Sequence, residues 1–283
     1  MRRLTYTNSR GESILFDTEP YFIDSLTGIG EVSAEIQSQR APYQDGDTYI
    51  DTILQPRFPS LEGTIIEGDL LRMKRLRKQI LRVCNPKLGL GKLTLNLDGD
   101  TKEIYGVLDG APTFPERGEN LFQTFMINWK CPNPYWRDPK EVSRALRAYE
   151  GLFKLPMTFP FELGLSGDST IIVNEGDVES PVTIDIQGPI TNPQIINVTT
   201  GQYIRVNRSL SDNEVLHINT DDQNKRVEIY RNGATIEKAI GYLDHYSDFW
   251  KLEPGQNEIK YIADAGTANG IVAIAWHSYY LGV

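Results

Sequence analysis

Two short stretches of this sequence hold residue types that could catalyse a reaction. Asp244 and His245, with Asp248 nearby, have the side chains needed for general acid–base catalysis. No nucleophile or third ligand lies at a useful spacing, so ordinary hydrogen bonding is the better interpretation. Gly164–Gly167 resembles a nucleophile turn but is one residue short of G-x-S-x-G, and no parallel α/β pattern surrounds it. We therefore predict no catalytic residues.

Other stretches could hold a cation, a nucleotide or a reactive thiol. The carboxylates of Asp98–Asp100 are typical of a solvated hairpin turn. Gly28–Gly30 lacks the third glycine and the following helix of a dinucleotide site. The chain has three histidines, and its two cysteines, Cys84 and Cys131, form no C-x-x-C pair. The sequence thus predicts no metal and no cofactor, and the cysteines are expected to be small buried apolar residues.

The overall composition excludes several classes of protein. The chain has 283 residues, of which 24% are charged and 40% apolar, as in a globular protein of one large or two ordinary domains. A net charge of -9 argues against a free-standing nucleic-acid binder. The apolar runs are far too short to cross a bilayer, so no membrane insertion is expected. The N-terminus lacks the apolar segment of a secretory signal, and folding in a cytosol is expected.

One segment, Glu67–Cys84, has the pattern of a long amphipathic helix. Apolar residues recur on one face at steps of three and four: Leu70, Met73, Leu76, Ile80 and Val83. Asp69 is the expected N-cap, and Asn85-Pro86 ends the helix. Six lysines and arginines lie between Arg72 and Arg82. They could follow phosphates, although the lack of aromatic residues there favours a solvated face or an acidic surface of another subunit.

The rest of the chain predicts a mainly β protein. In the first half, Glu31–Gln37 alternates like a half-buried strand, and Lys92–Leu108 forms a hairpin. The second half is a series of short β-branched strands with turns about every 8–12 residues, which indicates a β-sandwich or jelly roll. Asn232-Gly233 is its clearest hairpin turn. Phe249–Leu252 has the pattern of a core strand.

Charge and pattern divide the chain into parts. Residues 1–140 carry a net charge of -1 and residues 141–283 a net charge of -8. The regular pattern lapses after Asp138, where a short helix-compatible stretch, residues 141–149, precedes a proline-punctuated extended segment. We therefore predict a first domain over residues 1–140, a linker over 141–165 and a second domain over 166–283.

Several motifs, taken in order, resemble those of the siphophage distal tail protein (Dit) family. Cys131–Trp136 (CPNPYW) closes the first β-rich domain, and Tyr43–Gly46 is similar to a loop within it. Thr191–Pro193 with Asn197–Gly201 fits the opening of the second sandwich. The run FWKLEPGQNEI, residues 249–259, is similar to the family's FW-L-PG-N-I segment. The resemblance extends over essentially the whole chain.

The resemblance implies a fold and a role without catalysis. An N-terminal β-sandwich with one α-helix and a β-hairpin would build a ring, usually a homo-hexamer. A C-terminal galectin-like sandwich would project outward and carry a receptor-binding protein or other baseplate parts. The ring would join the tail tube protein to the tail-tip hub protein. The expected location is the virion tail tip, after assembly in the cytoplasm of the host bacterium.

Two elements are candidates for the ring interface. The first is the Leu93–Leu108 hairpin with Leu93, Leu95 and Leu97, and the second is the Glu67–Cys84 helix. The interface residues expected on the helix are Arg72, Arg75 and Lys78. Both elements could instead have ordinary roles within the domain. A basic lumen would retain DNA electrostatically, so we expect the basic helix face to lie at a protein interface or outside the channel.

Two other functions remain open from the sequence. A carbohydrate-binding accessory protein could contact a cell-wall glycan through an aromatic cluster, namely Tyr242, Tyr246, Phe249 and Trp250. In a sandwich, such residues more often fill the core between the sheets. A hydrolase would need a carboxylate pair facing one cleft, which the sequence alone does not place.

Overall fold

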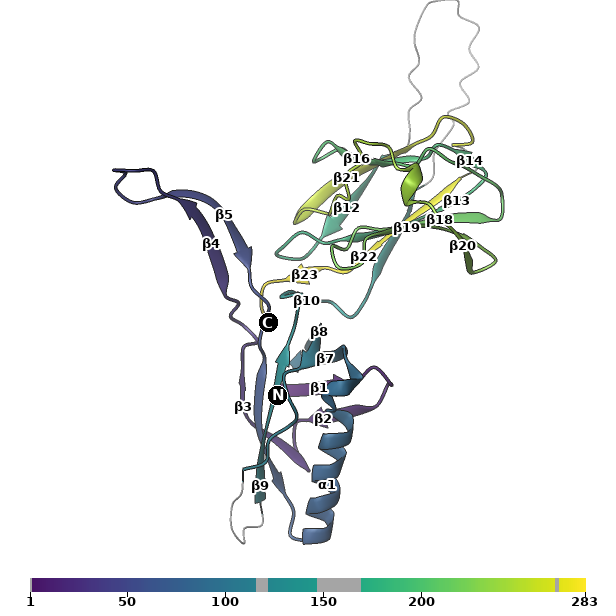
Figure 1. Ribbon diagram of the computed structural model, residues 1–283. Helices are drawn as coiled ribbons and strands as arrows, with labels where there is room; N and C mark the ends of the chain where they lie inside the picture. The colour runs from purple at the N-terminus through teal and green to yellow at the C-terminus, as the bar shows by residue number, and fades with distance from the viewer. Residues whose placement is uncertain (1, 116–121, 147–168, 268–269) are drawn as a thin grey trace, which may run out of the picture. The chain divides into compact units, whose positions relative to one another are not determined.

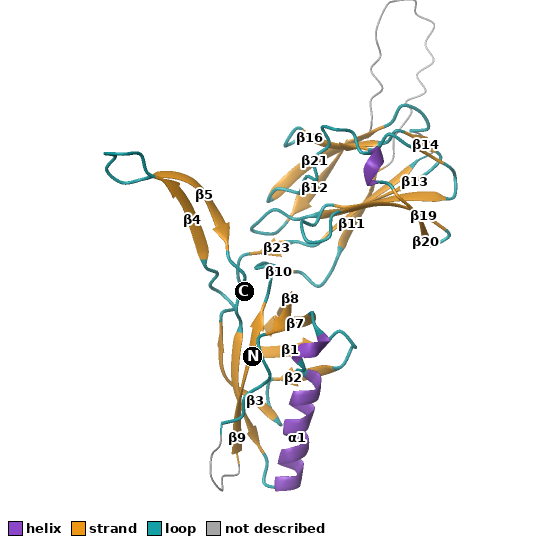
Figure 2. Cartoon of the chain, viewed as in Figure 1, coloured by secondary structure: helices purple, strands orange, loops and turns teal. Residues whose placement is uncertain are grey.

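The computed structural model describes residues 2–115, 122–146, 169–267 and 270–283, and these are mainly β with one α-helix (Figures 1 and 2). The described chain divides into two compact units. Unit 1 contains Met1–Pro139 and Tyr280–Val283, and unit 2 contains Lys140–Tyr279. The last four residues therefore belong to unit 1, whereas the sequence pattern assigned them to the second domain.

Along its N-terminal stretch, the described part of unit 1 holds ten strands, one α-helix and one short 3-10 helix. In chain order these are β1 (Arg2–Thr7), β2 (Ser13–Phe16), β3 (Tyr21–Thr27), β4 (Ala34–Gln39), β5 (Thr48–Leu54), β6 (Ser60–Ile66), α1 (Leu70–Val83), η1 (Pro86–Leu88), β7 (Gly91–Leu97), β8 (Asp100–Leu108), β9 (Phe122–Lys130) and β10 (Trp136–Arg137).

The main sheet of unit 1 runs in the order β2-β1-β7-β8-β9-β6-β3, and β10 pairs with β8. Its inner face carries an aromatic core in which Phe125 contacts Phe16 and Tyr21 at ring distances of 5.7 and 6.4 Å. Tyr6 lies 5.8 Å from Trp129. Such tilted and edge-on aromatic pairs bury large apolar areas, and they fix how the sheet curls.

The helix α1 packs against this core with the face that the sequence predicts, except at its start. Met73, Ile80 and Val83 are buried, and the Asp69 carboxylate caps the helix by accepting from the Leu71 backbone N–H at 2.8 Å. Leu70 is 73% exposed because it lies in the first turn, before the helix reaches the sheet.

Arg57 is a charged side chain buried at the base of the β4–β5 hairpin. Its exposed fraction is 1%, and its guanidinium donates only to backbone carbonyls. The acceptors come from three parts of unit 1: Ile29 (2.8 Å), Glu31 (2.8 Å), Pro134 (2.8 Å), Leu281, and at the limit of hydrogen bonding Gly28 (3.5 Å). The guanidinium thereby ties together chain segments that are remote in sequence.

The Cys131–Trp136 motif supplies part of the same anchor. The backbones of Cys131 and Arg57 exchange two hydrogen bonds, at 2.8 and 3.1 Å. Trp136 is fully buried and donates from Nε1 to the Ile29 carbonyl at 2.9 Å. The Asn133 side chain accepts from the Tyr135 backbone N–H at 3.1 Å, which holds the turn. The motif therefore fixes the entry of the chain into β4.

Unit 2 contains the remaining strands and a second 3-10 helix. They are β11 (Val142–Leu146), β12 (Ser169–Asn174), β13 (Val182–Gln187), β14 (Ile190–Thr191), β15 (Gln194–Asn197), β16 (Gln202–Arg205), β17 (Ser209–Leu210), β18 (Glu214–Asn219), β19 (Arg226–Arg231), β20 (Ala234–Lys238), η2 (Ile240–Tyr242), β21 (Gly255–Ile262), β22 (Ile271–Trp276) and β23 (Tyr279–Tyr280), which ends in unit 1.

Two sheets of unit 2 enclose one apolar core, as the sequence predicts. One runs β11-β22-β13-β18-β19-β20 and the other β12-β21-β15-β16. Buried residues of both, such as Ile184 and Ile259, belong to one cluster with Trp250 and Leu252. Asn232 and Gly233 have φ values of 52° and 77° at the β19–β20 turn, which confirms the predicted hairpin.

The segment after Asp138 differs from the sequence expectation where it is described. Residues 142–146 form β11, which pairs with β22, rather than starting a linker or a short helix. Leu146 is fully buried in the core of unit 2, and this tertiary contact overrides the local preference. The rest of the expected linker lies in residues 147–168, outside the described chain, as does Gly164–Gly167.

We predict that Arg57→Met lowers the free energy of unfolding of unit 1 by about 3–5 kcal/mol, because buried carbonyls lose their donors. Denaturant unfolding followed by tryptophan fluorescence measures the change. Arg40→Met is the matched control, since Arg40 is exposed at the hairpin tip, and should alter stability by less than about 0.5 kcal/mol. Equal effects of the two variants would show that the hydrogen bonds from Arg57 to the backbone carbonyls contribute nothing to the stability of unit 1.

Candidate functional site

The structure places the predicted hairpin residues inside unit 1 rather than on its surface. Leu93 and Leu95 are each 1% exposed, and Leu97 is partly buried against the same core. Their strand β7 pairs with β1 on one edge and β8 on the other, so it has no free edge. Leu93 and Leu95 therefore stabilise the fold of unit 1 and present no surface to another subunit, which corrects the expectation for this hairpin.

The predicted helix residues lie on the surface. Arg72, Arg75 and Lys78 are all exposed, and Arg72 forms an ion pair with Glu67 at 3.4 Å. Arg72 and Arg75 also line a shallow groove with Pro20 beside the start of α1. These side chains are available to a partner.

The β4–β5 hairpin is the most unusual surface of the described chain. Figure 1 shows it projecting from the sheet of unit 1, and its strands pair only with each other. Its residues are exposed on both faces apart from Leu54 and Gln44, which are partly exposed. The alternation in Glu31–Gln37 had indicated a half-buried strand, and this expectation is wrong because no second layer covers the hairpin.

Large apolar side chains lie on this exposed hairpin. Ile36 is 69% exposed, Tyr49 62% and Ile50 57%, and Tyr43 at the tip is fully exposed. A lone two-stranded hairpin is marginally stable in water at best, and its free edges and apolar residues favour association. We identify residues 34–54 as the candidate interaction site. The Tyr43–Gly46 motif, now seen at the hairpin tip, is the sequence signal that could have drawn attention to it.

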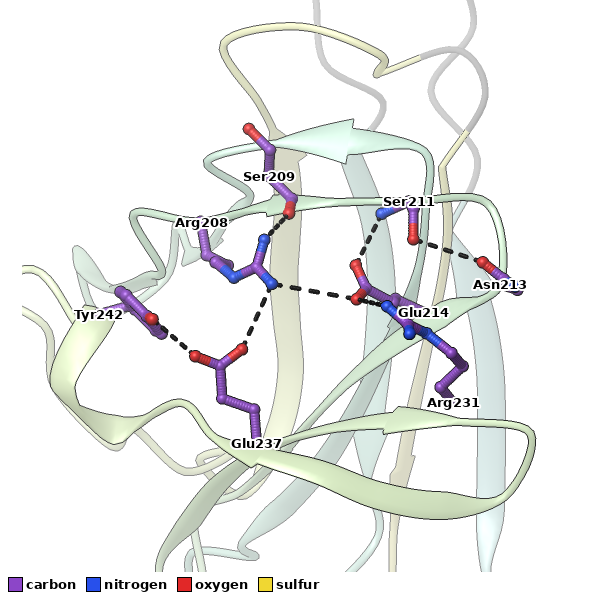
Figure 3. Close-up of polar contacts among 8 residues, drawn as sticks. All are labelled: Arg208, Ser209, Ser211, Asn213, Glu214, Arg231, Glu237 and Tyr242. Atoms are coloured by element: carbon purple, nitrogen blue, oxygen red, sulfur yellow. Dashed lines mark hydrogen bonds and ion pairs between the residues drawn. The ribbon is translucent and has the colours of Figure 1, made fainter.

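Unit 2 contains a polar network around a buried carboxylate (Figure 3). Glu214 is 3% exposed and accepts from Arg231 at 2.7 Å and from the Ser211 backbone N–H at 2.9 Å. Arg208 lies 3.9 Å from Glu214 and 3.3 Å from Glu237, which also accepts from the Tyr242 hydroxyl at 2.6 Å. The network connects β18, β19 and β20 to Arg208 and Ser211, which precede β18 in the chain.

The chemistry of this network does not suit hydrolysis. The hydrogen bond from the Ser211 backbone N–H is the main cause that lowers the pKa of Glu214. The Tyr242 hydroxyl is the main cause that lowers the pKa of Glu237. Both carboxyl groups are therefore ionised at neutral pH, whereas a glycosidase pair needs one protonated acid. The network is best explained as structural.

The other candidates have ordinary structural surroundings. Asp244 accepts from the Tyr203 hydroxyl at 2.9 Å, which lowers the pKa of its carboxyl. Burial raises the pKa of the Cys84 and Cys131 thiols to about 12, and both are free and fully buried, as expected. His217 contacts Asp185 at 2.7 Å. Within the described residues, no group of three metal-ligating side chains occurs.

The aromatic residues proposed for glycan binding do not form a platform. Trp250 is 1% exposed and belongs to the sandwich core, against which Phe249 packs. Tyr246 is 76% exposed and contacts the His245 ring edge-on, while Tyr242 donates to Glu237. Residues 249–259, which carry the family resemblance in this region, contain a turn. Buried Asn257 holds it by donating to the Glu253 carbonyl at 2.7 Å.

Family models match both units of the chain. Residues 9–131 match the phage tail protein RIFT-related domain, and residues 175–280 match the C-terminal domain of the siphovirus-type tail component. The chain belongs to the siphophage distal tail protein family. A sequence comparison with curated proteins gives no match.

Solved structures of two phages share the fold of this distal tail family member. The Dit protein of phage SPP1 matches with a TM-score of 0.70 and 16% identity, over 98% of this chain and 99% of that one. A chain of the phage p2 baseplate in its activated conformation with Ca matches with a TM-score of 0.55 and 13% identity, over 100% of both. In the described part of the present chain, no helix is long and apolar enough to span a membrane.

We predict that Glu214→Gln lowers the free energy of unfolding of unit 2 by about 1–3 kcal/mol at pH 7, since charge-assisted hydrogen bonds are lost. The folded-state pKa of Glu214 is lowered, so its stabilisation is complete above the unfolded value of about 4.3 and disappears as the pH falls through the folded value. Urea unfolding at pH 7 and in acid tests this. Exposed Glu258→Gln is the control, and a difference that grew on acidification would contradict the assignment.

Proposed function

We propose that this chain assembles into a ring in the tail tip of a siphophage, between the tail tube protein and the tail-tip hub protein. Membership of the distal tail protein family supports a structural role at the tail tip. The observation that carries the ring proposal is the exposed β4–β5 hairpin, which has the properties of a subunit contact. The proposed role is that of an assembly platform without enzymatic activity.

The hairpin fits a ring because it is incomplete within one chain. A partner that covers Ile36 and Ile50 would remove exposed apolar area and would stabilise a hairpin that water alone stabilises poorly. The base of the hairpin is nevertheless fixed by the hydrogen bonds from Arg57 to backbone carbonyls. The β4–β5 hairpin therefore leaves unit 1 in a defined direction, as a contact repeated around a ring requires.

Unit 2 is suited to carry other proteins in this proposal. Its core is closed between two sheets, and the acidic groups of its main polar network are paired internally. We assign ring formation to unit 1, and to unit 2 an outward role that includes binding of a receptor-binding protein. In the ring, we expect the basic face of α1 to point away from the DNA channel, because a basic lumen would bind phosphates.

The proposal predicts a mass of about 190 kDa in solution, six copies of the 32.0 kDa chain. Light scattering coupled to size exclusion, with the chain alone and with its tail tube protein, measures it, and electron microscopy should show a central channel. Replacing exposed apolar residues in Ile36→Ser/Ile50→Ser should reduce the mass towards one chain, because association loses apolar burial.

Ile171→Ser/Val173→Ser is the matched control, since both residues are exposed β-branched residues on a strand of unit 2. This variant should keep the mass of the wild type. A single-chain mass at every concentration, both alone and with the tail tube protein, would contradict ring formation.

A further inference from the structure

We propose that the β4–β5 hairpin of one copy docks on the basic face of α1 in a neighbouring copy. The inference rests on the proposed ring and names one pair of surfaces that meets in it, using the hairpin face opposite to Ile36. Figure 1 shows the hairpin extending away from the sheet that α1 covers, so the two surfaces of one chain do not meet. A contact between two different surfaces of identical chains is heterologous, and it produces a ring where the rotation closes.

The hairpin presents an acidic surface. Residues 34–54 contain four carboxylates and one guanidinium, a net charge of -3. In the described chain, the polar contacts of these carboxylates are to neutral groups. Glu35 accepts from Gln55 at 2.7 Å, Asp51 from a backbone N–H at 2.7 Å, and Asp47 from Ser38. No cation among the described residues of unit 1 forms an ion pair with them.

Two of these carboxylates lie on the same face of the hairpin. Glu35 pairs across the ladder with Ile53, and Gln37 pairs with Asp51, so these four side chains share one face. Glu35 and Asp51 are diagonal neighbours, which places them about 7–8 Å apart. Ile53 is 45% exposed beside them. This face thus offers two negative charges next to an apolar side chain.

The helix presents the complementary charge. The segment 70–83 contains six lysines and arginines and no carboxylate. Three of these cations are engaged within unit 1: Arg72 with Glu67 at 3.4 Å, Arg82 with Glu12 at 3.4 Å, and Arg77 over the Phe114 ring at 4.8 Å. Lys74, Arg75 and Lys78 have no ion pair among the described residues.

The free lysines lie on a stripe that also matches the hairpin in shape. Leu71, Lys74, Lys78 and Leu81 follow one another at steps of three, four and three, and so share one helix face. Leu71 is 68% exposed and Leu81 42%. Lys74 and Lys78 repel each other at this spacing and lie about 6 Å apart along the axis. Glu35 and Asp51, at their spacing on the hairpin, would neutralise both lysines. Ile53 would then contact one of the two exposed leucines of the stripe.

A nucleic acid is a poorer occupant of the helix face. Phosphates would pair with the same lysines, but they would leave Ile53 and Leu71 exposed and would be repelled by the nearby acidic hairpins of a ring. A second copy of the chain covers Ile53 and Leu71 and balances the charges of both surfaces at once. The occupant of the helix face is therefore a neighbouring copy.

Charge reversal tests the docking. Lys74→Glu/Lys78→Glu on the helix, or Glu35→Lys/Asp51→Lys on the hairpin, turns attraction into repulsion and should weaken association about tenfold or more per contact. A chain that combines all four substitutions restores opposite charges and should recover the wild-type mass. Light scattering at low and moderate salt measures the mass, and circular dichroism checks the fold.

Lys87→Glu/Lys238→Glu is the matched control for the helix variant, because it introduces the same change in net charge at exposed lysines outside both surfaces. This variant should assemble as the wild type does. If either single-surface reversal also keeps the full mass, the docking proposal is overturned while the ring proposal stands. If the wild type itself remains a single chain with its tail tube protein, both proposals fail.

A cysteine pair gives a direct second measurement. The native thiols of Cys84 and Cys131 are buried, so Asp51→Cys/Lys78→Cys introduces the only accessible thiols of the described chain. Mild oxidation should link copies into a covalent ladder that neither single variant forms. A double variant that assembles without forming a ladder would place the hairpin on another surface.

Discussion

The buried guanidinium of Arg57 is the interaction on which the arrangement of unit 1 depends. A charge removed from water is tolerated only where dipoles replace its hydration, and here backbone carbonyls of the β3–β4 connection, the CPNPYW motif and the C-terminal segment provide them. Because a carbonyl is held by its own backbone, satisfying the charge also fixes three segments. The hairpin arm can therefore be fully exposed and still leave unit 1 from a rigid base.

Local features were predictable from the sequence, and long-range ones were not. The α1 helix, its Asp69 cap and the Asn232-Gly233 turn depend on residues a few positions apart, and the structure confirms them. The partners of Arg57 lie between 26 and 224 positions away, so no spacing rule could have identified it as buried. For the same reason β11 looked like a linker: only its pairing with β22 makes it a strand.

The candidate site was missed for a different physical reason. Period-two alternation predicts burial of one face only when the same chain supplies the covering layer. Residues Ala34–Gln39 alternate as a buried strand does, yet no described residue of unit 1 covers them. The leucines of β7 alternate just as well and are buried. Hydrophobic patterning records that a surface is to be covered, but not whether its own unit or a second copy covers it.

The two surfaces of the proposed contact also explain why the basic helix carries so much like charge. Unpaired neighbours such as Lys74 and Lys78 destabilise the isolated helix, whereas pairing with carboxylates from another copy converts that cost into specificity. An acidic arm repels another acidic arm and a basic helix repels another basic helix, so the symmetric pairings that would end growth as a dimer are disfavoured. Only the head-to-tail pairing remains, and the rigid base at Arg57 sets the angle at which it repeats.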